Sequence, residues 1–305
     1  MTHRIASVDI GSNSVIMLVA EPDGNGGWTR LVDRVAVTRI SEGLDFSGRL
    51  ALEPVARTRA KLEEFALEAR EMEVRAAMIT GTAPFRRSTN GAEVAESLGS
   101  VFGAPVTVVS GEEEAALSLL ATQRSFPALR SMLVVDVGGA STELIYADES
   151  GSEMVSMDIG SVRLTERCVP SHPLTTEAAA ALAATIDDEL ARPEVAAIFA
   201  KEAEAVVGIA GTVTTLVTVA LGMDDYDDQV VHGYRLGTGS VGELFEALAA
   251  ESVEQRCMRP GLPAKRADVL PAGAFLLSKI LTNAGASEVI VSDRGTRWGR
   301  LYRDA

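Results

Sequence analysis

Two short turns in this sequence combine carboxylates, hydroxyls and glycines in a pattern suited to phosphate chemistry. In one of them, a hydrophobic run ends in Asp136, and Gly138, Gly139, Ser141 and Glu143 follow within seven positions. Glycines let backbone N–H groups approach an anion closely, and such turns can form phosphate-binding nests. The two carboxylates only accept hydrogen bonds, so beside a phosphate they need a cation such as Mg²⁺ between them. Taken alone, the pattern is equally consistent with an ordinary hairpin turn.

The chain carries this pattern twice. Residues 7–16 align without a gap with residues 134–143, which places Asp9 opposite Asp136. The aligned small residues are Gly11 with Gly138 and Ser14 with Ser141. An internal repeat of this kind predicts two related domains, each beginning with the same hairpin. Two such turns that face each other across a cleft could hold a phosphate chain from both sides, as in the actin-like ATPase and sugar kinase superfamily that these turns resemble.

A run of three glutamates, residues 112–114, begins a predicted helix. Ser110 and Glu113 fit a capping box, and acidic side chains at a helix start complement the helix dipole. Glu114 lies further round the helix, where it could point into the cleft and act as a general base on water. Of the three, Glu114 is therefore the candidate for catalysis.

Two further segments carry groups suited to anions. Gly211 and Thr212 follow a hydrophobic run and begin a helix, whose N-terminal N–H groups suit an anion; a simple threonine cap is the alternative. The Arg86 guanidinium suits a terminal phosphate and the charge that develops on transfer, whereas Arg87 is better explained as a solvated side chain. Arg266 with Asp268, and residues 292–297, could belong to the site or could form interdomain salt bridges.

Hydrophobic periodicity predicts the elements that position these groups. In the first half we expect strands at 4–10, 15–20, 28–40, 76–80 and 105–110, and helices at 52–72, up to 102 and up to 123. In the second half we expect strands at 132–137, 143–147, 154–159, 204–209 and 288–292, and helices at 176–190, 193–201, 210–221, around 244, at 265–282 and from 295. Strands that alternate with helices indicate an α/β class with a mixed sheet in each half. The Ser125–Ala128 segment predicts the boundary between an N-terminal lobe, 1–125, and a C-terminal lobe, 126–305.

Composition narrows the class of protein. A net charge of −15 argues against a nucleic-acid-binding surface, which is normally basic. The N-terminus lacks a signal-peptide pattern, and no apolar run reaches the roughly 18 residues that a membrane span needs. Cys168 and Cys257 form no metal-ligand spacing, so we expect buried thiols in a reducing cytoplasm.

The motifs together resemble the exopolyphosphatase and guanosine pentaphosphate phosphohydrolase family, and they occur in family order over nearly the whole chain. The matching segments are Asp9–Ser14, Thr82 with Arg86 and Asn90, Ser110–Ala115, Asp136–Glu143, Gly208–Thr212, Arg266–Asp268 and Ser292–Arg297. The sequence departs from the family at Ala140, which replaces a third glycine, and at Trp298, where the family often has Glu. We take these differences to affect the substrate more than the reaction.

The resemblance implies a fold, a reaction and roles for residues. The fold is two actin-like (ribonuclease H-like) lobes with mixed sheets flanked by helices and an active site in the interdomain cleft. The reaction is hydrolysis of a terminal phosphoanhydride with Mg²⁺, or Mn²⁺ as an alternative. Carried over by position, Glu114 and Arg86 are catalytic, and Asp136 and Glu143 lie at the metal. The implied phosphate-binding residues are Asp9, Gly11, Ser12, Asn13, Gly138, Gly139, Ser141, Gly211 and Thr212.

Several functions stay open from the sequence. An exopolyphosphatase that releases orthophosphate from short-chain polyphosphate is the first, and a guanosine pentaphosphate phosphohydrolase is the second. A kinase of the same superfamily would need an adenosine pocket, and a non-catalytic polyphosphate or nucleotide sensor would not need the three carboxylates. With 28 Lys plus Arg against 43 Asp plus Glu, a long basic track is not expected, which favours short chains and distributive cleavage. No nucleic-acid or membrane partner is expected, and a homodimer is left open.

Overall fold

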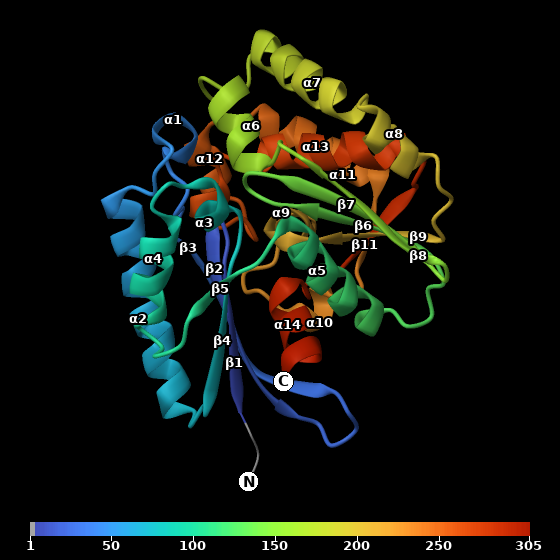
Figure 1. The fold of residues 1–305 in the computed structure, drawn as a ribbon. Helices are drawn as coiled ribbons and strands as arrows, with labels where there is room; N and C mark the ends of the chain where they lie inside the picture. The colour runs from blue at the N-terminus through green and yellow to red at the C-terminus, as the bar shows by residue number, and fades with distance from the viewer. Residues whose placement is uncertain (1–3) are drawn as a thin grey trace. The chain divides into compact units, whose positions relative to one another are not determined.

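The computed structural model describes residues 4–305, which form two compact units (Figure 1). One unit comprises the chain up to Ala121 together with Thr296–Ala305, and the other comprises Thr122–Gly295. The last ten residues, which the sequence analysis included in the C-terminal lobe 126–305, thus pack with the first unit. The final helix returns to the first unit because its apolar side chains, Trp298 and Leu301, pack against Leu18 and Ala20 of the first sheet.

The first unit is built on a five-stranded mixed sheet in the order β3-β2-β1-β4-β5. Its strands are β1 (Ile5–Ile10), β2 (Ser14–Pro22), β3 (Trp28–Val37), β4 (Ala76–Gly81) and β5 (Val106–Val108). Its helices are α1 (Leu44–Ser47), α2 (Leu52–Glu71), α3 (Ala83–Arg87), α4 (Gly91–Gly99), α5 (Gly111–Ser125) and α14 (Thr296–Asp304). The first three strands are antiparallel neighbours, whereas β4 and β5 are added in parallel. Helix α5 continues past Ala121 into the second unit.

Alternation along β1 sends its side chains to two different layers. Ala6, Val8 and Ile10 lie in a core shared with α2 and α4. Ile5 on the opposite face packs with the cluster that contains Trp298 of α14. By the same alternation Asp9 lies on the face of Ile5, so its carboxylate points towards the layer that contains α14.

The second unit repeats the plan on a six-stranded mixed sheet in the order β10-β11-β9-β6-β7-β8. Its strands are β6 (Met132–Val137), β7 (Thr142–Asp148), β8 (Gly151–Met157), β9 (Ala205–Ile209), β10 (Arg235–Gly237) and β11 (Glu288–Val291). Its helices are α6 (Ser161–Cys168), α7 (Thr176–Leu190), α8 (Pro193–Phe199), α9 (Ala210–Leu221), α10 (Asp228–Val231), α11 (Thr238–Ala249), α12 (Val253–Cys257) and α13 (Leu270–Asn283), with a 3₁₀ turn at Ala264–Arg266. Again the first three strands are antiparallel. Strands β9 and β11 are added in parallel, and β10 pairs antiparallel with β11 at the edge.

The second unit also contains elements that periodicity did not predict. Helices α6, α10 and α12 and strand β10 are short, and the expected helix 265–282 divides into the 3₁₀ turn and α13. The expectation that both cysteines are buried is wrong for Cys257, which is exposed. Its neighbour Arg256 takes the buried position of α12, and consecutive helical residues point in different directions.

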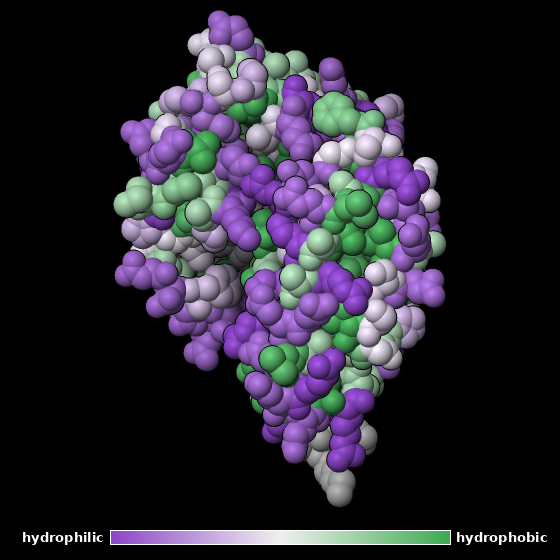
Figure 2. All heavy atoms as spheres, turned by 90° about the vertical axis from the view of Figure 1, so that its left-hand side faces the viewer, coloured by the Kyte–Doolittle hydropathy of each residue, from purple (hydrophilic) through white to green (hydrophobic). Residues whose placement is uncertain are grey.

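Hydrophilic side chains dominate the face of the molecule drawn in Figure 2, with smaller apolar areas between them. Within residues 4–305, no helix combines the length and the apolar character required to cross a membrane.

Candidate active site

The turn between β1 and β2 is closed by its own backbone and held by the segment after β3. The Gly11 N–H donates to the Ser14 carbonyl at 3.0 Å. The Asn13 carbonyl accepts from the N–H groups of Thr38 and Arg39, each at 3.0 Å, and Ser41 donates to the Ser12 carbonyl at 3.3 Å. The turn is thus held both by its own hydrogen bond and by those from residues 38–41. The Gly11 N–H is used to close the turn.

The Asp9 carboxylate ends β1 beside this turn. Its Oδ1 is buried and has no hydrogen-bond partner within residues 4–305. Burial raises the pKa of Asp9 to about 6, and the positive charge of Arg297 opposes that rise. Asp9 is thus a half-buried carboxylate with one oxygen kept from water, which raises the free energy of its ionised form.

Glu114 and Arg86 come together with Asp9. The Arg86 Nη1 donates to Glu114 Oε2 at 2.9 Å and to the Val109 carbonyl at 2.8 Å. Burial and the neighbouring Asp9 raise the pKa of Glu114 to about 7, and the Arg86 guanidinium only partly offsets them. A carboxylate with a pKa near neutrality can take a proton from water and release it again at cellular pH. The structure therefore unites the three charged residues that the sequence singled out in the first unit.

The helix start explains why Glu114 and not its neighbours takes this place. The Glu113 N–H donates to Ser110 Oγ at 3.0 Å, as the capping pattern predicts, and the Glu113 side chain pairs with Arg303 at 3.0 Å. Glu112 is exposed. Arg87, expected to be a surface residue, pairs with Asp45 at 2.7 Å.

The equivalent turn of the second unit, between β6 and β7, forms hydrogen bonds both within itself and to the start of α6. The Gly138 N–H donates to the Ser141 carbonyl at 3.1 Å, and the carbonyls of Gly138 and Gly139 accept from the first N–H groups of α6, at 2.9 to 3.1 Å. A Cβ atom at Gly160 would lie 2.6 Å from the Gly139 carbonyl, so only glycine permits this approach. Ala140 does not have a positive φ, and its methyl group is therefore accommodated without backbone strain.

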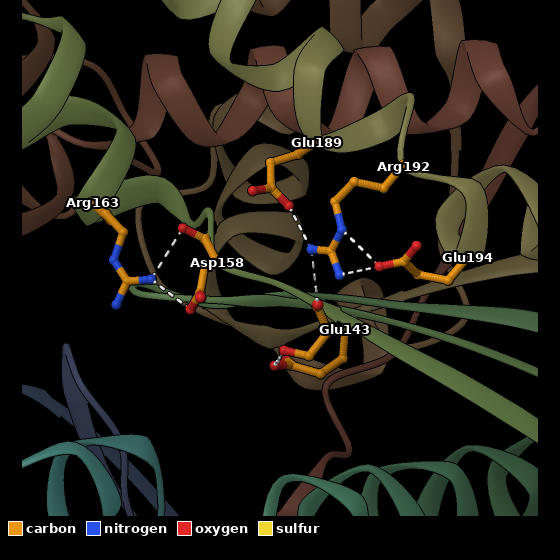
Figure 3. A network of polar contacts seen from close by, with 7 residues as sticks. Glu143, Asp158, Arg163, Glu189, Arg192 and Glu194 are labelled. Carbon is orange, nitrogen blue, oxygen red and sulfur yellow. Dashed lines mark hydrogen bonds and ion pairs between the residues drawn. The ribbon is translucent and has the colours of Figure 1, made fainter.

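Asp136 and Glu143 lie directly opposite each other in the antiparallel β6–β7 pair. The next strand continues the row, because Glu143 lies opposite Ser156, whose Oγ donates to Glu143 Oε1 at 2.9 Å (Figure 3). Arg192 reaches the Ser156 carbonyl at 3.5 Å and is itself held by Glu189 and Glu194. Like charges directly opposite each other in a sheet repel, and two carboxylates are a donor set that suits Mg²⁺ when water and phosphate oxygens complete the coordination. Asp136 and Glu143 can therefore supply part of the coordination of the ion. Residues 4–305 contain no group of three or more His, Cys, Asp or Glu side chains that could hold a metal by themselves.

The start of α9 meets a basic residue. A Cβ atom at Gly211 would lie 2.2 Å from Arg266 Nη2, so the guanidinium lies against the first turn of the helix. Burial lowers the pKa of Arg266 to about 10. Ala210, between β9 and this turn, has a φ of 70°, and Thr212 is buried. Two segments that the sequence presented separately thus form one positively charged corner of the second unit.

Comparison with known proteins agrees with this arrangement. The model of the Ppx/GppA phosphatase family matches residues 18–305. The chain belongs to this family. It is 31% identical over 303 residues to Exopolyphosphatase 2 of Mycobacterium tuberculosis, with 95% of each chain covered. It is 30% identical to the guanosine-5'-triphosphate,3'-diphosphate pyrophosphatase of Vibrio cholerae, of which the match covers 58%.

A solved structure of the family shares the fold. The crystal structure of the Aquifex aeolicus member of the Ppx/GppA family superposes with a TM-score of 0.82 at 30% identity, covering 99% of this chain and 97% of that one. The two units, each with a mixed sheet flanked by helices, are therefore those of the two-domain actin-like fold, as the sequence predicted. Membership of a phosphatase family makes hydrolysis the reaction class.

Three residues of this phosphatase-family chain were missed in the sequence. Asp33 pairs with Arg297 at 2.7 Å, and His232 pairs with Asp293 at 3.0 Å. Ser156 supports Glu143. Asp33 and His232 lie far in sequence from their partners. Ser156 is on the strand next to Glu143, and only the strand register, not a motif, could have indicated it.

Proposed function

We propose that the chain hydrolyses the terminal phosphoanhydride of short inorganic polyphosphate and releases orthophosphate. The observation that carries the proposal is Glu114, held by Arg86 at 2.9 Å beside Asp9 and given a pKa of about 7. A general base works best when its pKa is near the pH at which it operates. No alcohol acceptor is needed when water is the nucleophile.

In the proposed step, water attacks the terminal phosphorus while Glu114 accepts its proton. The bond between that phosphorus and the bridging oxygen breaks, and the shortened chain leaves with the bridging oxygen. Arg86 stabilises the charge that develops on the terminal phosphate oxygens. The phosphates are oriented by Asp9, by the turn residues Gly11–Asn13 and Gly138–Ser141, and by the start of α9 at Gly211–Thr212.

Asp136 and Glu143 are the proposed residues on the metal side of the site. Mg²⁺, with Mn²⁺ as an alternative, would neutralise phosphate charge beside these two carboxylates. Ser156 Oγ restrains one oxygen of Glu143 and so keeps the carboxylate oriented along the row of the sheet.

Charge supports the choice of a short substrate. The chain has a net charge of −15, and several arginines near the motifs are already paired with carboxylates: Arg86 with Glu114, Arg87 with Asp45 and Arg297 with Asp33. Little unpaired positive charge is left to track a long polyanion. The relative named Exopolyphosphatase 2 matches over 95% of both chains, and this supports our ranking of polyphosphate as the first candidate.

Guanosine pentaphosphate is the second candidate, favoured by the 30% identity to the Vibrio cholerae pyrophosphatase. The match spans only 58% of that protein, and for this reason we rank it behind polyphosphate.

Phosphate release from short polyphosphate, long polyphosphate and guanosine pentaphosphate, each with Mg²⁺ and without any acceptor, tests the proposal. We expect the highest kcat/KM with the short chain and a ladder of shortening products on a gel of the long chain. Full-length chain that coexists only with free phosphate would contradict distributive cleavage. Absence of phosphate release from all three substrates would overturn the hydrolase assignment to this site.

A further inference from the structure

Arg297, near the start of α14, lies on the same face of the first sheet as Asp9. Ser7 and Asp9 alternate with the core residues of β1, and the Ser7 hydroxyl donates to the Arg297 carbonyl at 2.8 Å. In the strand register Ser7 lies opposite Leu18, and Leu18 lies opposite Asp33. Asp33 therefore projects to this face as well, and its Oδ2 accepts a hydrogen bond from Arg297 Nη2 at 2.7 Å.

Helix α14 packs closely against α5, the helix that carries Glu114 (Figure 1). A Cβ atom at Gly299 would lie 2.0 Å from the Leu117 carbonyl, and Ser118 and Thr296 share a hydroxyl hydrogen bond at 3.2 Å. Both hydroxyls are buried. The position of Arg297 relative to α5 is thus set by direct backbone packing and not by a flexible surface contact.

The charges around Asp9 form an alternating series. Glu114 from α5 and Arg297 from α14 face Asp9, Arg86 from α3 faces Glu114, and Asp33 from β3 faces Arg297. Arg297 and Asp33 are almost fully buried, with 9% and 14% of their side chains exposed. Water therefore screens the Arg297–Asp33 pair only weakly. The positive charge of Arg297 is shared between two carboxylates, of which only Asp9 adjoins the proposed base.

We propose that Arg297 is a positioning residue for the hydrolytic reaction: it holds Asp9 in its ionised form, and Asp33 sets how strongly it does so. The proposal rests on the proposed function of Glu114 as a base. Ionised Asp9 raises the proton affinity of Glu114, so Arg297 acts on the base through Asp9. The C-terminal helix thereby supplies one member of the charged series around Asp9, whose other members come from the first 114 residues.

Two substitutions separate this role from simple packing. Arg297→Met removes the positive charge and should make Asp9 harder to ionise. Asp33→Asn removes the competing carboxylate, so that Arg297 acts on Asp9 alone and Asp9 becomes easier to ionise. Loss of packing would affect both variants in the same direction, whereas the proposal requires opposite directions.

The direct measurement is the titration of the Asp9 carboxyl carbon by NMR, with aspartate-selective ¹³C labelling and with Asp9→Asn to assign the signal. In wild type burial raises the pKa of Asp9 to about 6. We expect Arg297→Met to raise the midpoint by about one pH unit or more, since an opposite charge shifts a carboxyl by roughly one to three units. Asp33→Asn should lower the midpoint, and Arg297→Lys should leave it near the wild-type value because the charge remains.

The acid limb of kcat/KM for short polyphosphate, which reports ionisation of Glu114, should move in the opposite directions, because a less ionised Asp9 raises the proton affinity of Glu114 less. Arg300→Met is the matched control, because Arg300 is a similarly buried arginine of α14 that pairs with Asp304 at 3.0 Å; it should leave the Asp9 midpoint unchanged. Midpoints that shift in the same direction in Arg297→Met and Asp33→Asn, or do not shift, overturn the proposal. If Arg297→Met does not fold, Asp33→Asn and Arg297→Lys still decide it. If wild type hydrolyses none of the substrates, the NMR titration still tests the charge relation while the proposed function fails separately.

Discussion

Replacing Glu114 with glutamine should remove activity and stabilise the fold at the same time. The pKa of Glu114 rises from 4.5 to about 7 on folding. Since one pKa unit corresponds to about 1.4 kcal/mol, ionised Glu114 costs the folded state up to about 3 kcal/mol above pH 7. This is an upper value, because 24% of the side chain is exposed. Glutamine is neutral, and its amide oxygen can still accept the hydrogen bond from Arg86.

The pH dependence has a definite sign. Between pH 4.5 and pH 7, folded wild type binds more protons at Glu114 than the unfolded chain does. The contribution of Glu114 to stability therefore falls as the pH rises through this window and is constant above it. Glu114→Gln lacks this contribution, so the stability difference between variant and wild type should increase from pH 5 to pH 8.

Urea unfolding at pH 5, 6, 7 and 8, combined with phosphate-release assays, measures both effects. We expect kcat to fall by about 10²- to 10⁴-fold, as for other lost general bases. Glu112→Gln is the matched control on the same helix: its side chain is exposed, and both rate and stability should stay close to wild type. Turnover of Glu114→Gln at the wild-type rate would refute the base assignment, and a variant less stable than wild type at pH 8 would refute the burial argument.

Three further predictions concern separate parts of the molecule. Chelation should abolish phosphate release, and Glu143→Ala should raise the Mg²⁺ concentration for half-maximal rate at least about tenfold; full activity in excess chelator would refute the metal requirement. Arg86→Lys should reduce kcat at least about tenfold because the lysine ammonium is a compact point charge without the planar guanidinium geometry that reaches both Glu114 and the Val109 carbonyl, whereas Arg87→Lys should change little. Ala210→Gly should stabilise the chain by about 1 kcal/mol in urea unfolding, because the φ of 70° at Ala210 is strained for any residue with a Cβ atom.

The sequence was most informative where the structure is local. The hairpins at Asp9 and Asp136 and the helix start before Glu114 follow from alternation, turn residues and capping chemistry within about ten positions each. The repeat between residues 7–16 and 134–143 also predicted that both sheets begin with antiparallel strands, and both do. Local rules suffice here because the residues that determine these features are neighbours in the chain.

Other parts of the site depend on contacts between distant residues, and sequence patterns did not reveal them. The return of α14 to the first sheet follows from packing of Trp298 on Leu18, which only a complete sheet can offer. Arg266 lies on Gly211 although 55 positions in the numbering separate them. Helix α6 was missed because its first N–H groups are satisfied by the carbonyls of the turn at Gly138 and not by a side-chain cap.

The two copies of the hairpin have different surroundings, and these surroundings suit the two different roles that we propose for Asp9 and Asp136. Asp9 lies near Arg297 and Glu114, and burial raises the pKa values of both carboxyls towards neutrality, which favours proton transfer. Asp136 instead lies opposite a second carboxylate, Glu143, in the same sheet, an environment that favours a cation. The turn itself cannot cause this difference, because it is the repeated part. The difference arises from the elements next to each hairpin. In the first unit these are helices α5 and α14, which carry ionisable side chains; in the second unit it is strand β8, which carries the Ser156 hydroxyl.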